Sequence, residues 1–442
     1  MSHSSIGYLV FAGLLLLIAV RTPIGIAMFV AGAVGYCHLI DWNWAIFLAS
    51  LKNLAYARLS NYDLAVIPLF LLMGQFATHG GLSRGLFNFV GAFVGHRRGG
   101  IAYAAIGACA GFGAICGSSV ATAATMGQVA LPELRRHRYK GSLATGALAA
   151  GGTLGILIPP SIPLVIYAIL TQESIGKLFT AAVVPGLLAT LGYMIVVRII
   201  VSRDPEAGPA GPRASWSHRL STLLGVIPIL LVFVIVIFGI YAGWTNATEA
   251  AAVGAAACGV IAVAKGGFGW RAFADSLLGT AQSTAMIMLI LLGADMMNTA
   301  LAVSQLPAEL ASAVSASGLP PLLVIAGILL IYIFLGCVMD SLAMILLTIP
   351  IFYPVVMGLD FFGLSAADKS VWFGILALTV VEIGLIHPPV GLNVYIINRM
   401  AKDVPLAETF KGVIPFLASD FIRIVALVMF PAISLFLVRY AG

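Results

Sequence analysis

Long apolar segments recur from one end of the chain to the other, and short polar stretches separate them. Many of these segments approach the length of about 20 residues that a helix needs to cross a bilayer. The pattern therefore predicts a polytopic membrane protein built from helices. The predicted spans cover residues 6–20, 23–40, 63–78, 143–170, 179–200, 221–242, 247–264, 281–303, 371–399 and 411–437.

The apolar region 100–134 is too short for two complete spans, which need about 40 residues and a turn. Basic residues flank it at 96–98 and at 135–140, so both flanks are expected in the cytoplasm. Its middle, GAICGSSVATAATMG, is small and polar, as suits a re-entrant helical hairpin that lines a cavity. One span followed by an amphipathic segment is the alternative. The hairpin tip is expected at Gly117, Ser118 and Ser119.

The apolar region 319–358 has few basic flanking residues and is expected to open toward the opposite, outer side of the membrane. Its middle, LGCVMDSLAMILLTIP, again combines a glycine with polar residues. We therefore predict a second re-entrant hairpin. Its tip is expected at Gly336, Asp340 and Ser341.

The pattern G-x-x-x-P-P follows each hairpin, and its two copies lie 229 residues apart. Proline interrupts a membrane helix, and the freed carbonyls and new helix N-terminus can hold a cation and an anion. Paired interrupted helices indicate the central site of a secondary transporter. We predict broken helices over 143–170 and 371–399. The motif residues are Gly155, Pro159 and Pro160 in the first copy and Gly384, His387, Pro388 and Pro389 in the second.

Each half of the chain then contains about five spans and one hairpin. Because five is an odd number, the second half begins on the opposite side of the membrane and is inverted relative to the first. The first repeat is assigned to 1–200 and the second to 221–442. The segment 201–220 is rich in proline, glycine and arginine and is predicted to be a cytoplasmic linker. The fold class is an all-α polytopic membrane protein with two inverted repeats. Both termini are expected in the periplasm.

Composition supports the membrane assignment. The chain is 61% hydrophobic and only 9% charged, whereas soluble domains have about 25% charged residues. The net charge of +6 comes from short basic loops, so it predicts membrane orientation and no binding of nucleic acid. The five cysteines lie in apolar segments without metal-ligand spacing and are interpreted as buried hydrophobic residues.

Six segments together resemble the large membrane subunit of tripartite ATP-independent periplasmic (TRAP) transporters, over nearly the whole chain. They are IPLFLLMGQFATHGGLSRG (67–85), GSSVATAATMG (117–127), GILIPPSIPLVIYA (155–168), TEAAAVGA (248–255), GCVMDSLAMILLTIPIFYPVV (336–356) and EIGLIHPPVGLNVYI (382–396).

The resemblance implies an elevator-type importer in the bacterial inner membrane, in which the hairpins and broken helices slide against a scaffold. A periplasmic binding protein would deliver an organic acid, such as a C4-dicarboxylate, a keto acid or a sugar acid. A sodium gradient would drive import, with no further cofactor. A small four-helix membrane subunit would complete the complex. Neither the acid nor the oligomeric state can be deduced from the sequence.

The same resemblance implies site residues by motif. The first ion site would contain Gly117, Ser118, Ser119 and Gly155. The second would contain Gly336, Gly384 and His387. The substrate cavity would be lined by Ser119, Pro159, Pro160, Asp340, Ser341, Pro388, Pro389 and Asn393.

Three residues raise separate questions. His387 stands where the family usually has threonine, and three alternatives follow. The ring turns away and backbone carbonyls hold the sodium ion, or His387 carries a proton in place of sodium, or His387 contacts the carboxylate of the substrate. Glu382 and Asp295 are intramembrane acids, which are functional candidates by default. Glu382 could serve unwound backbone or pair with His387, whereas Asp295 has no motif support.

Two other functions remain open at this stage. A stand-alone carboxylate symporter of related architecture would need no binding protein. An intramembrane hydrolase would use Ser118 or Ser119 as nucleophile and His387 as base. The hydrolase would leave the repeat and the second hairpin unexplained.

Overall fold

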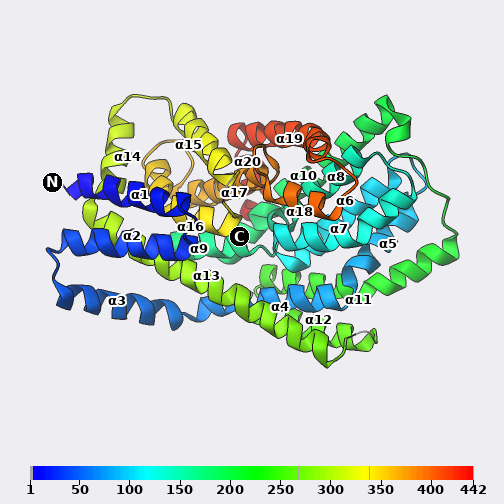
Figure 1. Ribbon diagram of the computed structural model, residues 1–442, viewed down its shortest axis with the longest axis horizontal. Helices are drawn as coiled ribbons and strands as arrows, with labels where there is room; N and C mark the ends of the chain where they lie inside the picture. Colours follow the sequence, from blue (N-terminus) through cyan, green and yellow to red (C-terminus); the bar gives the residue numbers. More distant parts are fainter. Residues whose placement is uncertain (1–2, 267, 338, 442) are drawn as a thin grey trace.

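The computed structural model describes residues 3–266, 268–337 and 339–441, and the regular secondary structure in these ranges is helical (Figure 1). The helices up to residue 203 are α1 (His3–Ala19), α2 (Ile24–Leu39), α3 (Trp44–Leu59), α4 (Val66–His79), α5 (Leu82–Val94), α6 (Gly100–Cys116), α7 (Ser119–Arg136), α8 (Gly141–Leu157), α9 (Ile162–Thr171) and α10 (Ile175–Arg203). A 3-10 turn, η1 (Tyr62–Ala65), precedes α4.

The remaining helices follow a short 3-10 turn, η2 (Pro205–Ala207). They are α11 (Trp216–Tyr241), α12 (Ala247–Ala264), α13 (Trp270–Ser304), α14 (Leu306–Ala316), α15 (Pro321–Gly336), α16 (Ser341–Met357), α17 (Ala366–Ile386), α18 (Leu392–Met400), α19 (Leu406–Met429) and α20 (Ala432–Ala441). The linker between α10 and α11 is shorter than the predicted 201–220. The repeat boundaries themselves stay a prediction.

The helices are those of a polytopic membrane protein. In the described ranges, seven are long and apolar enough to cross a bilayer, or eight if the pair α3 and η1–α4, bent by 53°, forms one span. Helices α1 and α2 fall where spans were predicted but have only 17 and 16 residues.

Several predicted boundaries are wrong. Helix α3 was not predicted, because Lys52 and Arg58 interrupt its apolar pattern. The short helices α5 and α14 were also missed. Helix α13 begins at Trp270, eleven residues before the expected span at 281. The span predicted over 411–437 is two helices, since the chain breaks at Pro431 between α19 and α20.

Both predicted hairpins are pairs of packed helices joined by a short turn. In the first, Gly117 adopts a left-handed conformation with φ of +62°, which glycine tolerates, and Ser118 caps α7. In the second, Asp340 caps α16 by accepting a hydrogen bond from the Ala343 amide at 2.7 Å. The chain therefore reverses direction at the expected polar residues.

Both predicted broken helices are interrupted at their Pro-Pro pairs, between α8 and α9 and between α17 and α18. Pro159 and Pro160 lie in the first break, and Pro388 and Pro389 in the second. Both Pro-Pro peptide bonds are cis. Proline lacks the amide hydrogen that would continue the preceding helix, so each helix ends here.

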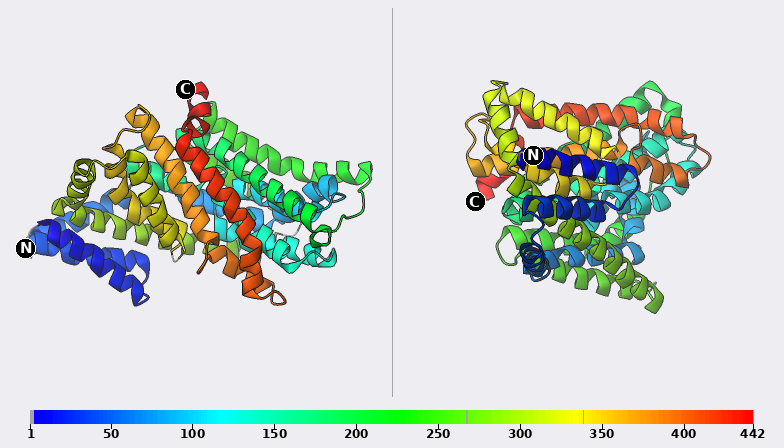
Figure 2. Two further views of the ribbon diagram at one scale, coloured as in Figure 1. Left: turned by 90° about the horizontal axis from the view of Figure 1, so that it is seen from above. Right: turned by 60° about the vertical axis from the view of Figure 1, so that its left-hand side comes forward.

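Helices α8 and α17 form the core of the molecule. The apolar window of α17 is entirely buried, and that of the α8–α9 segment is 83% buried. Helices α6, α7 and α19 pack on α8, while α15 and α16 pack on α17. A second group, α2, α4, α12 and α13, packs mainly on its own members. Figures 1 and 2 place α1 and α2 at one end of the molecule, and α5 with the α10–α11 linker at the other.

Candidate functional site

The tips of the two hairpins open into one cavity of about 330 Å³. Its opposite wall comes from Leu71 of α4 and from Ser283 and Met286 of α13, so the cavity lies between the core helices and the second group. The predicted residues that line it are Gly117, Ser118, Ser119, Asp340 and Ser341. Two polar turns from segments about 220 residues apart therefore share one compartment.

The prolines predicted for the substrate cavity do not line it. Pro159 and Pro160 are buried, whereas Pro388 and Pro389 are exposed. Pro163, in the first turn of α9, lines the cavity instead. The proline pairs therefore end the helices. Near the first pair, Ile156, Ile162 and Pro163 form part of the cavity wall, whereas no residue near the second pair is among those that line the cavity.

Asn393 also does not line the cavity, although it contacts a residue that does. Its Nδ2 donates to Ser119 Oγ at 2.7 Å and to the Ala149 carbonyl at 3.3 Å. The side chain is fully buried, and its Oδ1 has no hydrogen-bond partner among the described residues. Asn393 thus connects the second broken helix to the tip of the first hairpin.

The expected first ion site brings oxygen atoms close to Gly155. A Cβ placed on Gly155 would lie 2.8 Å from the Ser118 carbonyl oxygen and 2.4 Å from Thr122 Oγ1. The Thr122 hydroxyl is buried and has no hydrogen-bond partner in the described part of the chain. A side chain at position 155 would fill this space, which explains why glycine stands there.

Two residues of this site were missed in the sequence. Thr122 lies one turn after Ser118, so its position on α7 follows from helical spacing. Gly113 packs against Gly155, because a Cβ on Gly113 would lie 2.5 Å from the Gly155 Cα. The run of glycines before the first tip was the available signal.

At the expected second ion site, the backbone of Gly336 meets that of Gly384. A Cβ on Gly384 would lie 2.5 Å from the Gly336 Cα. The pair Gly336–Gly384 thus repeats the contact between Gly113 and Gly155. Only small residues allow a hairpin and a broken helix to approach this closely.

The His387 ring turns toward the backbone beside it. Its Nδ1 contacts the Pro388 carbonyl and lies 3.5 Å from Cys337 Sγ. The Cys337 thiol also donates to the Pro388 carbonyl at 3.4 Å. No described contact joins His387 to Glu382, so the pairing considered for these two residues is not observed.

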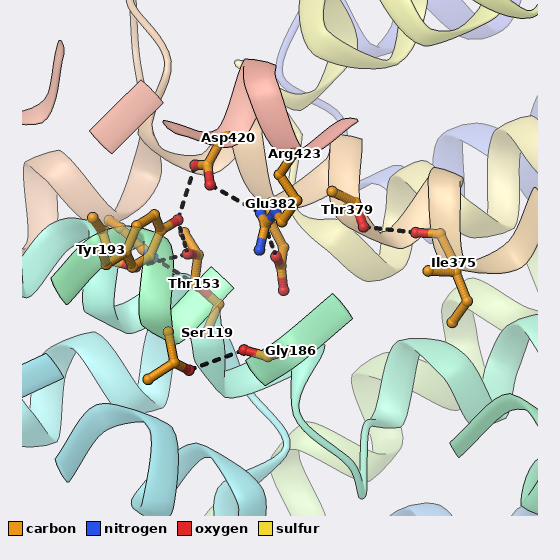
Figure 3. Close-up of polar contacts among 12 residues, drawn as sticks. Ser119, Thr153, Gly186, Tyr193, Ile375, Thr379, Glu382, Asp420 and Arg423 are labelled. Atoms are coloured by element: carbon orange, nitrogen blue, oxygen red, sulfur yellow. Dashed lines mark hydrogen bonds and ion pairs between the residues drawn. The ribbon is translucent and has the colours of Figure 1, made fainter. Parts of the chain in front are cut away.

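Glu382 belongs instead to a buried polar cluster that spans both broken helices (Figure 3). Arg423 Nη2 lies 3.7 Å from Glu382 Oε2 and 3.0 Å from Asp420 Oδ1. Tyr193 donates to Asp420 Oδ2 at 2.9 Å, and its hydroxyl lies 3.0 Å from Thr153 Oγ1. The cluster therefore links α8, α10, α17 and α19.

Thr153 and Glu382 occupy equivalent positions, since each lies two residues before the glycine of its Pro-Pro motif. Both carboxylates and the guanidinium are almost fully buried. Buried charges are stable only when paired, so Arg423 compensates Glu382 and Asp420. The suggestion that Glu382 serves unwound backbone finds no contact in the described residues.

Asp295 is part of a separate ion pair with Arg58 of α3, in which Arg58 Nε donates to Asp295 Oδ2 at 2.6 Å. Both side chains are largely buried. The pair joins α3 to α13. Asp295 is not among the residues that line the cavity, so its observed role is to pair with Arg58.

The serines and His387 do not form a hydrolytic pair. Ser118 Oγ accepts a hydrogen bond from the Ala121 amide at 3.4 Å, and Ser119 Oγ accepts from Asn393. His387 contacts Pro388 and Cys337. A nucleophile must lie within hydrogen-bond reach of its base, and no described contact provides this.

Comparison with known proteins identifies the family. Residues 11–433 match the model of the tripartite ATP-independent periplasmic transporter, DctM component. The chain belongs to this TRAP transporter family. It is therefore a large permease component of a membrane transporter, and it is not an enzyme.

Curated TRAP relatives align over most of the chain. The C4-dicarboxylate large permease DctM of Pseudomonas aeruginosa is 38% identical over 86% of this chain and 87% of that protein. The sialic acid large permease SiaM of Vibrio cholerae is 32% identical over 86% and 87%. The ectoine/5-hydroxyectoine large permease UehC of Ruegeria pomeroyi is 31% identical over 97% of both.

A solved structure shares the fold. The YdaH transporter of Alcanivorax borkumensis superimposes with a TM-score of 0.58 at 15% sequence identity, covering 88% of this chain and 89% of that one. At this identity the likeness concerns the fold alone. It supports the helical transporter architecture of the TRAP permease.

Proposed function

We propose that this TRAP permease imports an organic acid that a periplasmic binding protein delivers, driven by a sodium gradient and assisted by a small membrane subunit. The observation that carries the proposal is the cavity shared by the two hairpin tips. A cavity with polar hairpin tips, between the core helices and a second helix group, suits the central substrate site of an alternating-access transporter.

The substrate class rests on the relatives and on the chemistry of the cavity. Curated relatives are named for C4-dicarboxylate, sialic acid and ectoine. The N-terminus of α7 and the hydroxyls of Ser118 and Ser119 offer hydrogen bonds to an anion in the cavity. An organic acid fits these groups if its carboxylate lies against the start of α7, away from the Asp340 carboxylate on the other hairpin tip.

Sodium fits the oxygen atoms beside Gly155. A hard cation prefers oxygen ligands, and the Ser118 carbonyl and the free Thr122 hydroxyl approach this glycine. At the second site, the backbone at Gly336 and Gly384 and the last carbonyls of α17 would bind the sodium ion. The last carbonyls of a helix have no intrahelical partner and are therefore free to do so. Movement of the core domain against the second group would complete an elevator cycle.

Uptake into proteoliposomes tests the proposal. We expect substrate accumulation only when the permease, the small subunit and the loaded binding protein are present with an inward sodium gradient. Identifying the ligand of the binding protein supplies the substrate. Efficient uptake by the permease alone would contradict the proposal and favour a stand-alone carboxylate symporter.

The coupling ion is tested at His387. Because the ring turns toward Pro388 and Cys337, we expect the wild type and His387→Thr to depend equally on sodium and to ignore an imposed pH gradient. Proton coupling through His387 predicts the reverse. Wild-type uptake would follow the pH gradient, and His387→Thr would gain sodium dependence.

A further inference from the structure

A pocket of about 270 Å³ between α5, α6 and α10 has two arginines at its rim. Arg97 follows α5 and Arg198 lies near the end of α10, with Tyr103 of α6 between them in the lining. Neither arginine forms an ion pair with a carboxylate in the described residues. A pocket with two free guanidinium groups and a phenol is suited to an anion with several oxygen atoms.

The first carboxylate after α10, Asp204, is already paired with Lys140, and the loop after α5 is rich in basic residues. Arg219 of α11 contacts α5, where it donates to the Ala92 carbonyl at 3.1 Å, and it lies over the ring of Trp216. The pKa of His96, in the loop after α5, is lowered first by burial and then by the positive charges of Arg213, Arg219 and Arg97. The local field therefore favours an anionic ligand.

The rest of the pocket is apolar. Val94, Leu191 and Ile195 form its wall, and the last two are more than half exposed on the outer face of α10. The exposed apolar face continues along α10 to Leu187, which is 57% exposed. A free inorganic anion would not contact such an apolar surface, whereas the acyl chain of a lipid would pack against it.

The length of this face matches one leaflet of a membrane. Leu187 precedes Arg198 by 11 residues, which is about 16 Å along a helix. Half of the hydrocarbon core is about 15 Å thick. A lipid with its headgroup at Arg198 would therefore reach the middle of the bilayer beside Leu187.

We propose that this pocket binds an anionic phospholipid of the cytoplasmic leaflet, with its phosphate between Arg97 and Arg198 and an acyl chain along α10. Basic pockets between membrane helices on the cytoplasmic side recognise such headgroups. The phosphate diester supplies acceptors for both guanidiniums and for the Tyr103 hydroxyl. The bound lipid would tie the base of the first hairpin to α10.

Lipid binding to the purified permease in a neutral detergent tests this inference. Native mass spectrometry would count bound phosphatidylglycerol and phosphatidylcholine, and thermal unfolding would report stabilisation by each lipid. We expect selective binding of phosphatidylglycerol. In the Arg97→Gln/Arg198→Gln variant, the apparent affinity should fall about thirty-fold, from the loss of two arginine contacts with anionic lipid.

The matched control is Arg98→Gln/Arg203→Gln, which removes the same charge from exposed neighbours outside the pocket. It should bind phosphatidylglycerol nearly as well as the wild type. Equal losses in both variants would overturn the proposal, because attraction would then be nonspecific. Equal stabilisation by inorganic phosphate and by phosphatidylglycerol would also overturn it, since the ligand would then be a free anion.

Discussion

At the scale of single residues, the hydrogen bond between Asn393 and Ser119 connects the two halves of the chain. We predict that Asn393→Ala and Ser119→Ala each lower the stability by about 1–3 kcal/mol. The first removes the donor to the buried Ser119 hydroxyl, and the second leaves one N–H of Asn393 without an acceptor while the other keeps the Ala149 carbonyl. The double variant should lose less than the sum of the two. Thermal unfolding of all four proteins measures this coupling.

A neighbouring asparagine provides the control for this double-mutant cycle. Asn398 lies on the same helix but donates to the Val404 carbonyl and to Thr409. Combining Asn398→Ala with Ser119→Ala should give additive losses. Additive losses for Asn393 and Ser119 as well would contradict the contact.

Arg423 carries the second prediction at this scale. Removing it in Arg423→Met leaves Glu382 and Asp420 buried without a positive partner, which costs about 3–5 kcal/mol. The exposed pair of Arg439 and Asp368 is the control, and Arg439→Met should cost about 0–1 kcal/mol. Thermal unfolding in the same detergent compares them.

Neutralising Glu382 tests whether the stability lost in Arg423→Met can be restored. Adding Glu382→Gln to Arg423→Met removes one of the unpaired charges, so part of the lost stability should return. If the Arg423 and Arg439 variants were equally stable, the cluster would not be the buried ion pair described above.

At the scale of elements, the close approach of α15 and α17 depends on glycine. Gly384→Ala places a Cβ 2.5 Å from the Gly336 Cα, so the hairpin must move away from the broken helix. We predict a loss of about 1–3 kcal/mol from overpacking, together with loss of sodium-driven uptake. Thermal unfolding and proteoliposome uptake measure the two effects.

The same hairpin provides a matched control. Gly327 is also in α15, but no atom lies within 4 Å of a Cβ built there. Gly327→Ala should keep uptake and gain up to about 1 kcal/mol, because alanine is the better helix former. Equal behaviour of the two alanine variants would show that the Gly336–Gly384 contact is absent.

An ion pair between Lys140 and Asp204 joins the start of α8 to the end of α10, outside the membrane-spanning segments. The hydrogen bond from Lys140 holds the pKa of Asp204 below its usual value, and the same bond raises the pKa of Lys140. The stability from Asp204 is thus present above a pH of about 4 and lost below it. The stability that Lys140 contributes is lost only at high pH, where its ammonium group loses its proton.

We therefore predict that Asp204→Asn lowers the unfolding temperature at neutral pH, and that the difference from the wild type disappears as the pH falls below about 4. High salt should also reduce it. Asp360→Asn, at an exposed residue without an ion pair in the described chain, is the control and should show neither effect. A difference that persisted in acid would point to a cause other than the ion pair.

At the scale of the whole molecule, the basic loops predict the orientation in the membrane. A cysteine at the exposed Arg136, at the end of α7, should be labelled only from the cytoplasmic side. A cysteine at the exposed Ser317, before the second hairpin, should be labelled only from the periplasmic side. Membrane-impermeant maleimides applied to cells and to inverted vesicles measure both.

The five native cysteines are buried, so the wild-type background should be low. Labelling of the Arg136 cysteine from outside alone would contradict the first re-entrant hairpin, because its two flanks must lie in the cytoplasm. Labelling of the Ser317 cysteine from the cytoplasm alone would contradict the inverted second half.

The sequence by itself determined the helical membrane class, the two hairpin turns and the two helix breaks. These features depend on local chemistry, since hydropathy sets the spans while glycine and proline stop helices wherever they occur. The sequence predicted the boundaries of the helices less accurately than it predicted these features. Helices α3, α5 and α14 are short or interrupted by charges, and their stability comes from packing that a hydropathy pattern does not record.

Only the tertiary structure decided which groups meet. Ser119 and Asn393 are 274 residues apart, and Glu382 and Arg423 lie on different helices. The structure also separated the roles of the motif residues, since the hairpin tips line the cavity while the proline pairs end the helices. Such contacts depend on how distant helices pack, and a buried charge needs one specific partner wherever the fold places it.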